Sequence, residues 1–123
     1  MTPEIQKLEE QLQERKEIWW DWHKKNPQVW GKFEEYTLEA ITTGRKHYSH
    51  WAIMQRIRWN KEIDTNGGEF KISNDYIGFY ARLFHAHNPD HDDFFDLKQL
   101  KEEKEIDRLI ELMQGSKFVE VYK

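Results

Sequence analysis

The chain has 123 residues, of which 34% are charged and 37% hydrophobic, with six Trp and no Cys. Its length is typical of one domain, and the lack of Cys excludes disulfides, thiolate metal sites and cysteine nucleophiles. No run approaches the roughly 18 apolar residues that span a bilayer and the first residues carry no apolar signal region, so we expect a soluble, cytoplasmic protein without membrane contact.

The net charge of −4 hides an uneven distribution of charge along the chain. Residues 44–61 contain five Lys and Arg residues and no acid, so this segment carries +5 and the remainder carries −9. Such a split predicts a locally basic surface on an acidic body.

Helical signals begin at the N-terminus. Thr2 can cap a helix and Pro3 suits its first position. Apolar residues then recur every three or four positions until Asn26, which precedes a proline and is disfavoured in a helix. We expect residues 1–26 to form an amphipathic helix or arm, whose polar first half could pair in a homodimer, and residues 27–123 to form a helical core domain.

Four more helices follow from the apolar spacing and the turn residues, over residues 30–43, 50–64, from 74 onward, and about 95–114. Ser49 is expected to cap the helix that starts at residue 50, and Ser73 or Asn74 the next one. Glu69–Ile72 and Phe118–Tyr122 alternate polar and apolar residues and are predicted to pair as strands. The sequence therefore predicts a mainly α single domain of about five helices with a small two-stranded β ribbon. Its element order is similar to a helix-turn-helix or winged-helix arrangement with the ribbon as wing, although the connection between the third and fourth helices is longer than the usual turn.

The apolar stripes of these helices predict which residues form the core. The expected core residues are Phe33, Tyr36, Ile41, Ile53, Ile57, Tyr76, Phe79, Tyr80, Leu83, Leu109 and Ile110.

The segment GRKHYSHWAIMQRIRWNK, residues 44–61, is the leading candidate for a working surface. Basic side chains can contact phosphates, and Trp or Tyr rings can stack on unpaired bases. The segment thus favours a non-enzymatic module that contacts DNA or RNA. The candidate nucleic-acid-binding residues are Arg45, Lys46, Tyr48, Trp51, Gln55, Arg56, Arg58, Trp59 and Lys61.

A second interpretation is protein binding. Trp, Tyr and Arg are the residues enriched at interface hot spots, so the same segment could bind or inhibit a host protein. The acidic balance of the whole chain fits this interpretation better than nucleic-acid contact. If instead both Trp residues were buried and the arginines paired with neighbouring carboxylates, the segment would be purely structural.

A third interpretation is a metal-dependent enzyme. His85, His87 and His91 lie among aspartates and offer enough ligands for a divalent metal. Their spacing matches no catalytic signature, and the chain has no nucleophile elbow, P-loop or dinucleotide-binding glycine motif. We therefore expect no catalytic residue, no cofactor and no metal site.

Residues 57–89 also resemble a known group of sequences. The elements IRW (57–59), FKI-N-Y (70–76) and YARLF (80–84) are similar to those of a family of small uncharacterised proteins from phages, prophages and bacterial genomes. The resemblance covers about Phe33 to Phe95 and implies no activity and no site residue. It implies a context, that of a phage or mobile-element accessory protein that acts by binding.

Overall fold

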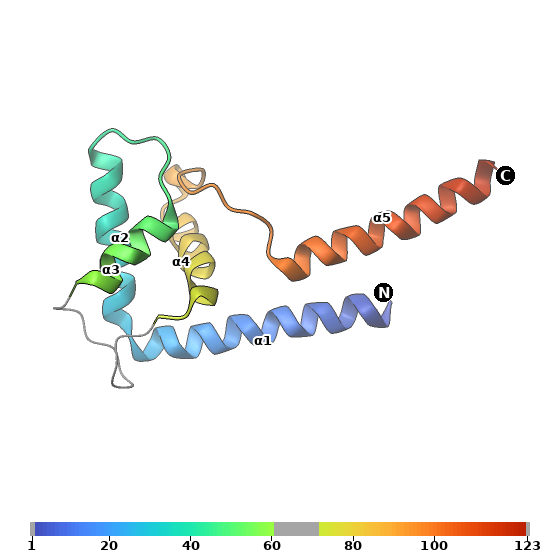
Figure 1. Ribbon diagram of the computed structural model, residues 1–123, viewed down its shortest axis with the longest axis horizontal. Coiled ribbons are helices and arrows are strands. Elements are labelled where there is room, and N and C mark those ends of the chain that lie inside the picture. The colour runs from blue at the N-terminus through green and yellow to red at the C-terminus, as the bar shows by residue number, and fades with distance from the viewer. Residues whose placement is uncertain (1, 61–71, 123) are drawn as a thin grey trace. The chain divides into compact units, whose positions relative to one another are not determined.

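The computed structural model describes residues 2–60 and 72–122 of the chain, and for residues 115–122 it describes the backbone helix alone (Figure 1). The elements in chain order are α1 (Pro3–Lys25), α2 (Pro27–Thr42), α3 (His50–Trp59), α4 (Asn74–His87), the short 3-10 helix η1 (Pro89–His91) and α5 (Lys101–Tyr122). Over these described ranges the chain is all-α, with five α-helices and no strand, which confirms the predicted helical class.

The predicted β ribbon is wrong for its second strand, because residues 118–122 continue α5. A glycine inside a helix costs only about 1 kcal/mol, so Gly115 does not have to end it. An unpaired strand would also leave its backbone groups without partners, whereas a helix bonds them internally. Residues 69–71 of the first predicted strand lie outside the described residues, and Ile72 is not in a strand.

The predicted helix caps are confirmed. The hydroxyl of Thr2 accepts from the Ile5 amide at 3.3 Å, and the hydroxyl of Ser49 accepts from the Ala52 amide at 3.3 Å. Ser73 caps α4 by accepting from an amide two residues on. Each bond satisfies one of the free N–H groups of a helix's first turn.

Several helix boundaries differ from the prediction. Helix α2 starts at Pro27 rather than at residue 30, since proline is well suited to the first helical position. Helix α3 ends at Trp59, followed by Asn60 in extended geometry, and not at residue 64. Helix α5 begins six residues later than expected, because Phe94 and Phe95 are buried in the preceding turn.

Contacts along the backbone divide the chain into two compact units. The core unit comprises residues 18–97, and the terminal unit comprises residues 1–17 together with residues 98–123. The predicted division into an arm (1–26) and a core domain (27–123) stays a prediction, as does self-association through the N-terminal helix. None of the described helices is both long enough and apolar enough to cross a membrane.

The core unit is built around aromatic rings. Tyr80 of α4 is fully buried, and its ring lies 5.3 Å from that of Trp19 and 5.8 Å from that of Phe33, measured between centroids. Burial raises the pKa of the Tyr80 hydroxyl far above its ordinary value. Each buried ring removes a large area from water, which compensates for the low aliphatic content.

The predicted core is correct for six residues, namely Phe33, Tyr36, Ile53, Ile57, Phe79 and Tyr80. Ile41, Tyr76, Leu83 and Leu109 are only half-buried, and Ile110 is exposed. Helix α4 is rotated relative to the predicted stripe, so that Ile77, Ala81 and Phe84 are buried with Tyr80. Phe79, about 100° from Tyr80 around α4, packs on Trp19 at 5.5 Å between ring centroids.

The terminal unit contains a buried ion pair. Nη1 of Arg15 donates to both carboxylate oxygens of Glu102, at 2.8 Å to Oε2, and Gln11 donates to the same oxygen at 3.4 Å. The Glu102 side chain is 0% exposed and that of Arg15 is 21% exposed. Burial alone would raise the pKa of Glu102, but the hydrogen bonds and charge of Arg15 hold it below its ordinary value.

Candidate binding surface on helix α3

Helix α3 buries one side and exposes the other. Ile53, Met54 and Ile57 point into the core unit and are buried. Trp51, Gln55 and Trp59 recur every four residues, so they share an arc of about 80° on the outer side, with the two tryptophans about 12 Å apart along the axis. We call these three residues the α3 face.

Both tryptophans of the α3 face are exposed to an unusual degree. Trp59 is 81% exposed and Trp51 is 46% exposed, and Gln55 between them is also exposed. Water-facing indole rings lose the favourable free energy of burial, about 25 cal/mol per Å² of apolar surface. The alternative in which these rings belong to the core is therefore excluded.

Arg58 is engaged within the fold. Its Nη2 donates to the backbone carbonyl of Ile72 at 2.5 Å and to Oδ1 of Asn74 at 2.7 Å. Ile72 lies just before α4 and Asn74 is its first residue, so Arg58 links the end of α3 to the start of α4 through these two hydrogen bonds. It also joins two of the elements on which the family resemblance rests, IRW and FKI-N-Y, and this gives both a structural role.

Arg56 points nearly opposite to Arg58, because two helical positions differ by about 200°. Its Nη2 lies 3.2 Å from Oε2 of Glu39, and its guanidinium carbon lies 3.9 Å from the centre of the Tyr36 ring. The hydroxyl of Tyr36 accepts in turn from Asn60 at 2.7 Å. The positive charge of Arg56 is thus compensated by a carboxylate and an aromatic face, both supplied by α2.

The remaining cations of the predicted site lie on the loop between α2 and α3. Arg45 and Lys46 are exposed, and the Arg45 guanidinium lies 4.9 Å from the centre of the Tyr48 ring. The backbone N–H of Tyr48 donates to the Phe94 carbonyl at 3.3 Å, which ties this loop to the turn before α5. Lys61 lies outside the described residues.

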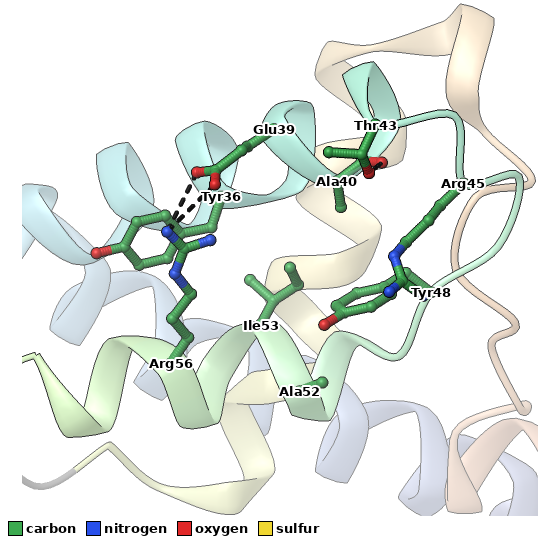
Figure 2. Close-up of a pocket in the computed structure, with 9 residues that line it drawn as sticks. All are labelled: Tyr36, Glu39, Ala40, Thr43, Arg45, Tyr48, Ala52, Ile53 and Arg56. Atoms are coloured by element: carbon green, nitrogen blue, oxygen red, sulfur yellow. Dashed lines mark hydrogen bonds and ion pairs between the residues drawn. The ribbon is translucent and has the colours of Figure 1, made fainter.

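Arg45, Tyr48 and Arg56 meet around a pocket of about 280 Å³ between α2, the loop and α3. Figure 2 shows the two arginines on opposite sides of this pocket, with Ile53 and Ala52 of α3 and Ala40 of α2 between them. We call it the Arg45–Arg56 pocket. Its other lining residues are Tyr36, Glu39, Thr43 and Tyr48.

The histidines of the third interpretation do not converge. Nε2 of His85 accepts from the backbone N–H of Phe95 at 3.1 Å, which fixes the ring against the loop. The ring of His87 lies 5.4 Å from that of Trp30, and His91 lines a different pocket beside Asp93. Over residues 2–60 and 72–114, no three His, Asp or Glu side chains are arranged to hold a metal ion.

The structure therefore divides the predicted site into three parts: the α3 face, the exposed loop cations Arg45 and Lys46, and arginines engaged in the fold. Six of the nine pocket residues were absent from the predicted site, among them the two that contact Arg56, Tyr36 and Glu39 of α2. No local pattern points to them, because they meet Arg56 only through the packing of α2 on α3. The one available signal is that residues 44–61 contain no acid, so a carboxylate partner for Arg56 has to come from another part of the chain.

Comparisons of this chain with protein-family models, with curated proteins and with solved structures gave no match. The resemblance to small phage and bacterial proteins stays a prediction.

Proposed function

We propose that this protein is a non-enzymatic binding module that contacts a partner protein through the α3 face. The observation that carries the proposal is the exposure of Trp51 and Trp59 on one side of a helix that bears no acid. Tryptophan and arginine are the residues most enriched at interface hot spots. A helix face about 12 Å long with an aromatic anchor at each end suits insertion into an apolar groove.

The charges around the α3 face indicate the chemistry of the partner. Helix α3 contains no carboxylate, and the preceding loop adds the exposed cations Arg45 and Lys46, whereas Arg56 and Arg58 are engaged within the fold. A complementary surface would be apolar at its centre and acidic at its rim, since opposite charges at a rim steer association. A host protein of a phage or mobile element is the partner that the sequence resemblance suggests.

Photo-crosslinking tests this proposal. A benzophenone amino acid in place of Gln55, in protein produced in bacterial cells, should give a discrete adduct that protease digests. The adduct should be lost when both Trp51 and Trp59 are replaced by Ala. The same crosslinker in place of Gln13, an exposed residue of the terminal unit, is the matched control and should give no such adduct.

The identified partner then allows a quantitative test. With both proteins purified, Trp59→Ala should weaken binding by at least 2 kcal/mol, roughly 30-fold in Kd, as expected of a hot-spot residue. The same adduct from the crosslinker at Gln55 and at Gln13, or a Kd that Trp59→Ala leaves unchanged, would show that the α3 face is not the binding surface.

Nucleic-acid binding is the second candidate function. The exposed Arg45 and Lys46 favour it, because they precede the N-terminus of α3, the helix that exposes two indole rings able to stack on bases. It has less support than protein binding, since Arg56 and Arg58 are engaged by protein groups and phosphate contact requires available cations.

Mobility shift of labelled single- and double-stranded DNA at low salt tests this second candidate. Binding should weaken steeply as salt rises and should require Trp51, Trp59, Arg45 and Lys46. In the crosslinking experiment, an adduct from Gln55 that nuclease rather than protease removes would favour this candidate. If no mobility shift is seen at low salt, nucleic-acid binding is ruled out and protein binding is the remaining candidate.

A further inference from the structure

The Arg45–Arg56 pocket carries an excess of one positive charge. Its lining contains two arginines and one carboxylate, that of Glu39, which leaves a net charge of +1. Glu39 is paired with Arg56. Among the residues that the structure describes, Arg45 forms no ion pair, so its guanidinium is the uncompensated charge of the pocket.

The Arg45 guanidinium is held at the pocket by its neighbours. Gly44 has a φ of 91°, a conformation that favours glycine and turns the chain just before Arg45. The guanidinium then lies over the Tyr48 ring at 4.9 Å, which leaves its N–H edge available to an acceptor. A guanidinium edge matches the two oxygens of a carboxylate.

The middle of the pocket is apolar. Ala40, Ala52 and Ile53 separate the two arginines, and no described side chain fills the space between them (Figure 2). Its volume of about 280 Å³ is below the range of about 300–1,000 Å³ that is usual for cofactors and drug-sized ligands. The space therefore suits a group about the size of one amino acid.

We propose that this pocket binds a carboxylate joined to a small apolar group, with Arg45 holding the carboxylate and Ala40, Ala52 and Ile53 contacting the apolar part. The C-terminal residue of a peptide and a free branched-chain acid both have this chemistry. Arg56, held by Glu39 and Tyr36, forms the far wall and contributes no net charge. The assignment depends on the pocket alone and is separate from the role of the α3 face.

Titration of the ¹⁵N-labelled full-length protein with N-acetyl-L-leucine, followed by amide NMR, tests the proposal. We expect saturable shifts at Arg45, Ala52 and Ile53 with a Kd of about 1 mM, which is typical of a ligand of this size. N-acetyl-L-leucinamide, which lacks the charge, and N-acetylglycine, which lacks the side chain, should each bind at least about 10-fold more weakly.

Two variants locate the site. Arg45→Gln should weaken the binding of N-acetyl-L-leucine at least about 10-fold. Arg108→Gln, a change at an exposed arginine of α5, should leave this affinity unchanged. Ala52→Phe should fill the pocket and abolish the shifts while Arg45 remains. The amide spectra of the free variants report whether each one is folded.

A tetrapeptide ending in Leu separates the two sources of the ligand. Binding at least as tight as that of N-acetyl-L-leucine would identify a chain terminus, and weaker binding would identify a free small acid. Equal affinity for the acid and its amide, shifts that survive Arg45→Gln, or tighter binding of phenyl phosphate than of any carboxylate would overturn the assignment.

Discussion

Replacing Arg58 and Arg56 separately by Ala should have very different effects on folding. Arg58→Ala removes two hydrogen bonds from a charged donor and leaves the carbonyl of the buried Ile72 without that donor. Hydrogen bonds to charged groups contribute about 1.5–3 kcal/mol each, and the two share one guanidinium that is partly exposed. We expect the free energy of unfolding to fall by about 2–3 kcal/mol.

Arg56→Ala provides the matched control. Its ion pair with Glu39 is half-exposed on both sides, and such pairs contribute at most about 1 kcal/mol. Stacking on Tyr36 adds about 0.5–1 kcal/mol at an exposed site, and the two contributions share the same side chain. We therefore expect a loss of about 1 kcal/mol or less.

Urea unfolding followed by tryptophan fluorescence measures both values, because all six Trp lie in the core unit. The slope of free energy against urea should be the same in both variants if each changes stability alone. Equal losses in the two variants, or less than about 0.5 kcal/mol for Arg58→Ala, would refute the assignment of Arg58 to the fold. If the assignment holds, lost binding in an Arg58 variant cannot be interpreted as a lost contact with a ligand.

Three further predictions follow from other parts of the chain. Glu102→Gln should destabilise the terminal unit by about 3 kcal/mol, because it leaves the charge of Arg15 without its carboxylate partner. Since the folded pKa of Glu102 is lowered from 4.5, the stabilisation by this ion pair is present above pH 4.5 and is lost as the pH falls through the folded pKa. Denaturation followed by circular dichroism at pH 7 and at pH 3 would measure both effects. Gly44→Ala should cost about 1–2 kcal/mol in the same urea assay, purely from backbone conformation, because no atom lies within 4 Å of the added methyl group. Burial lowers the pKa of His85 from 6.5, so as the pH falls the unfolded chain binds a proton at this residue before the folded chain does. The free energy of unfolding should therefore decrease as the pH drops below 6.5, and His85→Gln should reduce this pH dependence.

The features predicted correctly from the sequence depend on residues close together in the chain. The caps formed by Thr2, Ser49 and Ser73 bond to amides two or three residues away, so a short pattern contains the whole interaction. The apolar period likewise located all five helices. The wrong strand at residues 118–122 shows the limit of this reasoning, because alternation favours a strand only where a partner strand exists.

The features that the sequence did not predict join distant residues. Arg15 interrupts the apolar stripe of α1, and its partner Glu102 lies 87 residues later. Arg58 bonds to a carbonyl 14 residues later in the chain, so no short sequence pattern contains both partners. Trp19 of α1 packs on both Phe79 and Tyr80 of α4, which come much later in the chain, and the predicted stripe of α4 missed Ile77, which is buried.

The basic segment shows why a run of charges is a weaker guide to function than the spacing of its aromatic residues. Successive helical positions differ by about 100°, so Arg56 and Arg58 fall on opposite edges of α3, where different parts of the fold engage them. Positions four apart stay on one side, and Trp51, Gln55 and Trp59 therefore remain together facing water. A surface that the fold does not use and that stays apolar is the one on which binding should be sought, and this is why the α3 face, rather than the sum of the positive charges, supports the proposed function.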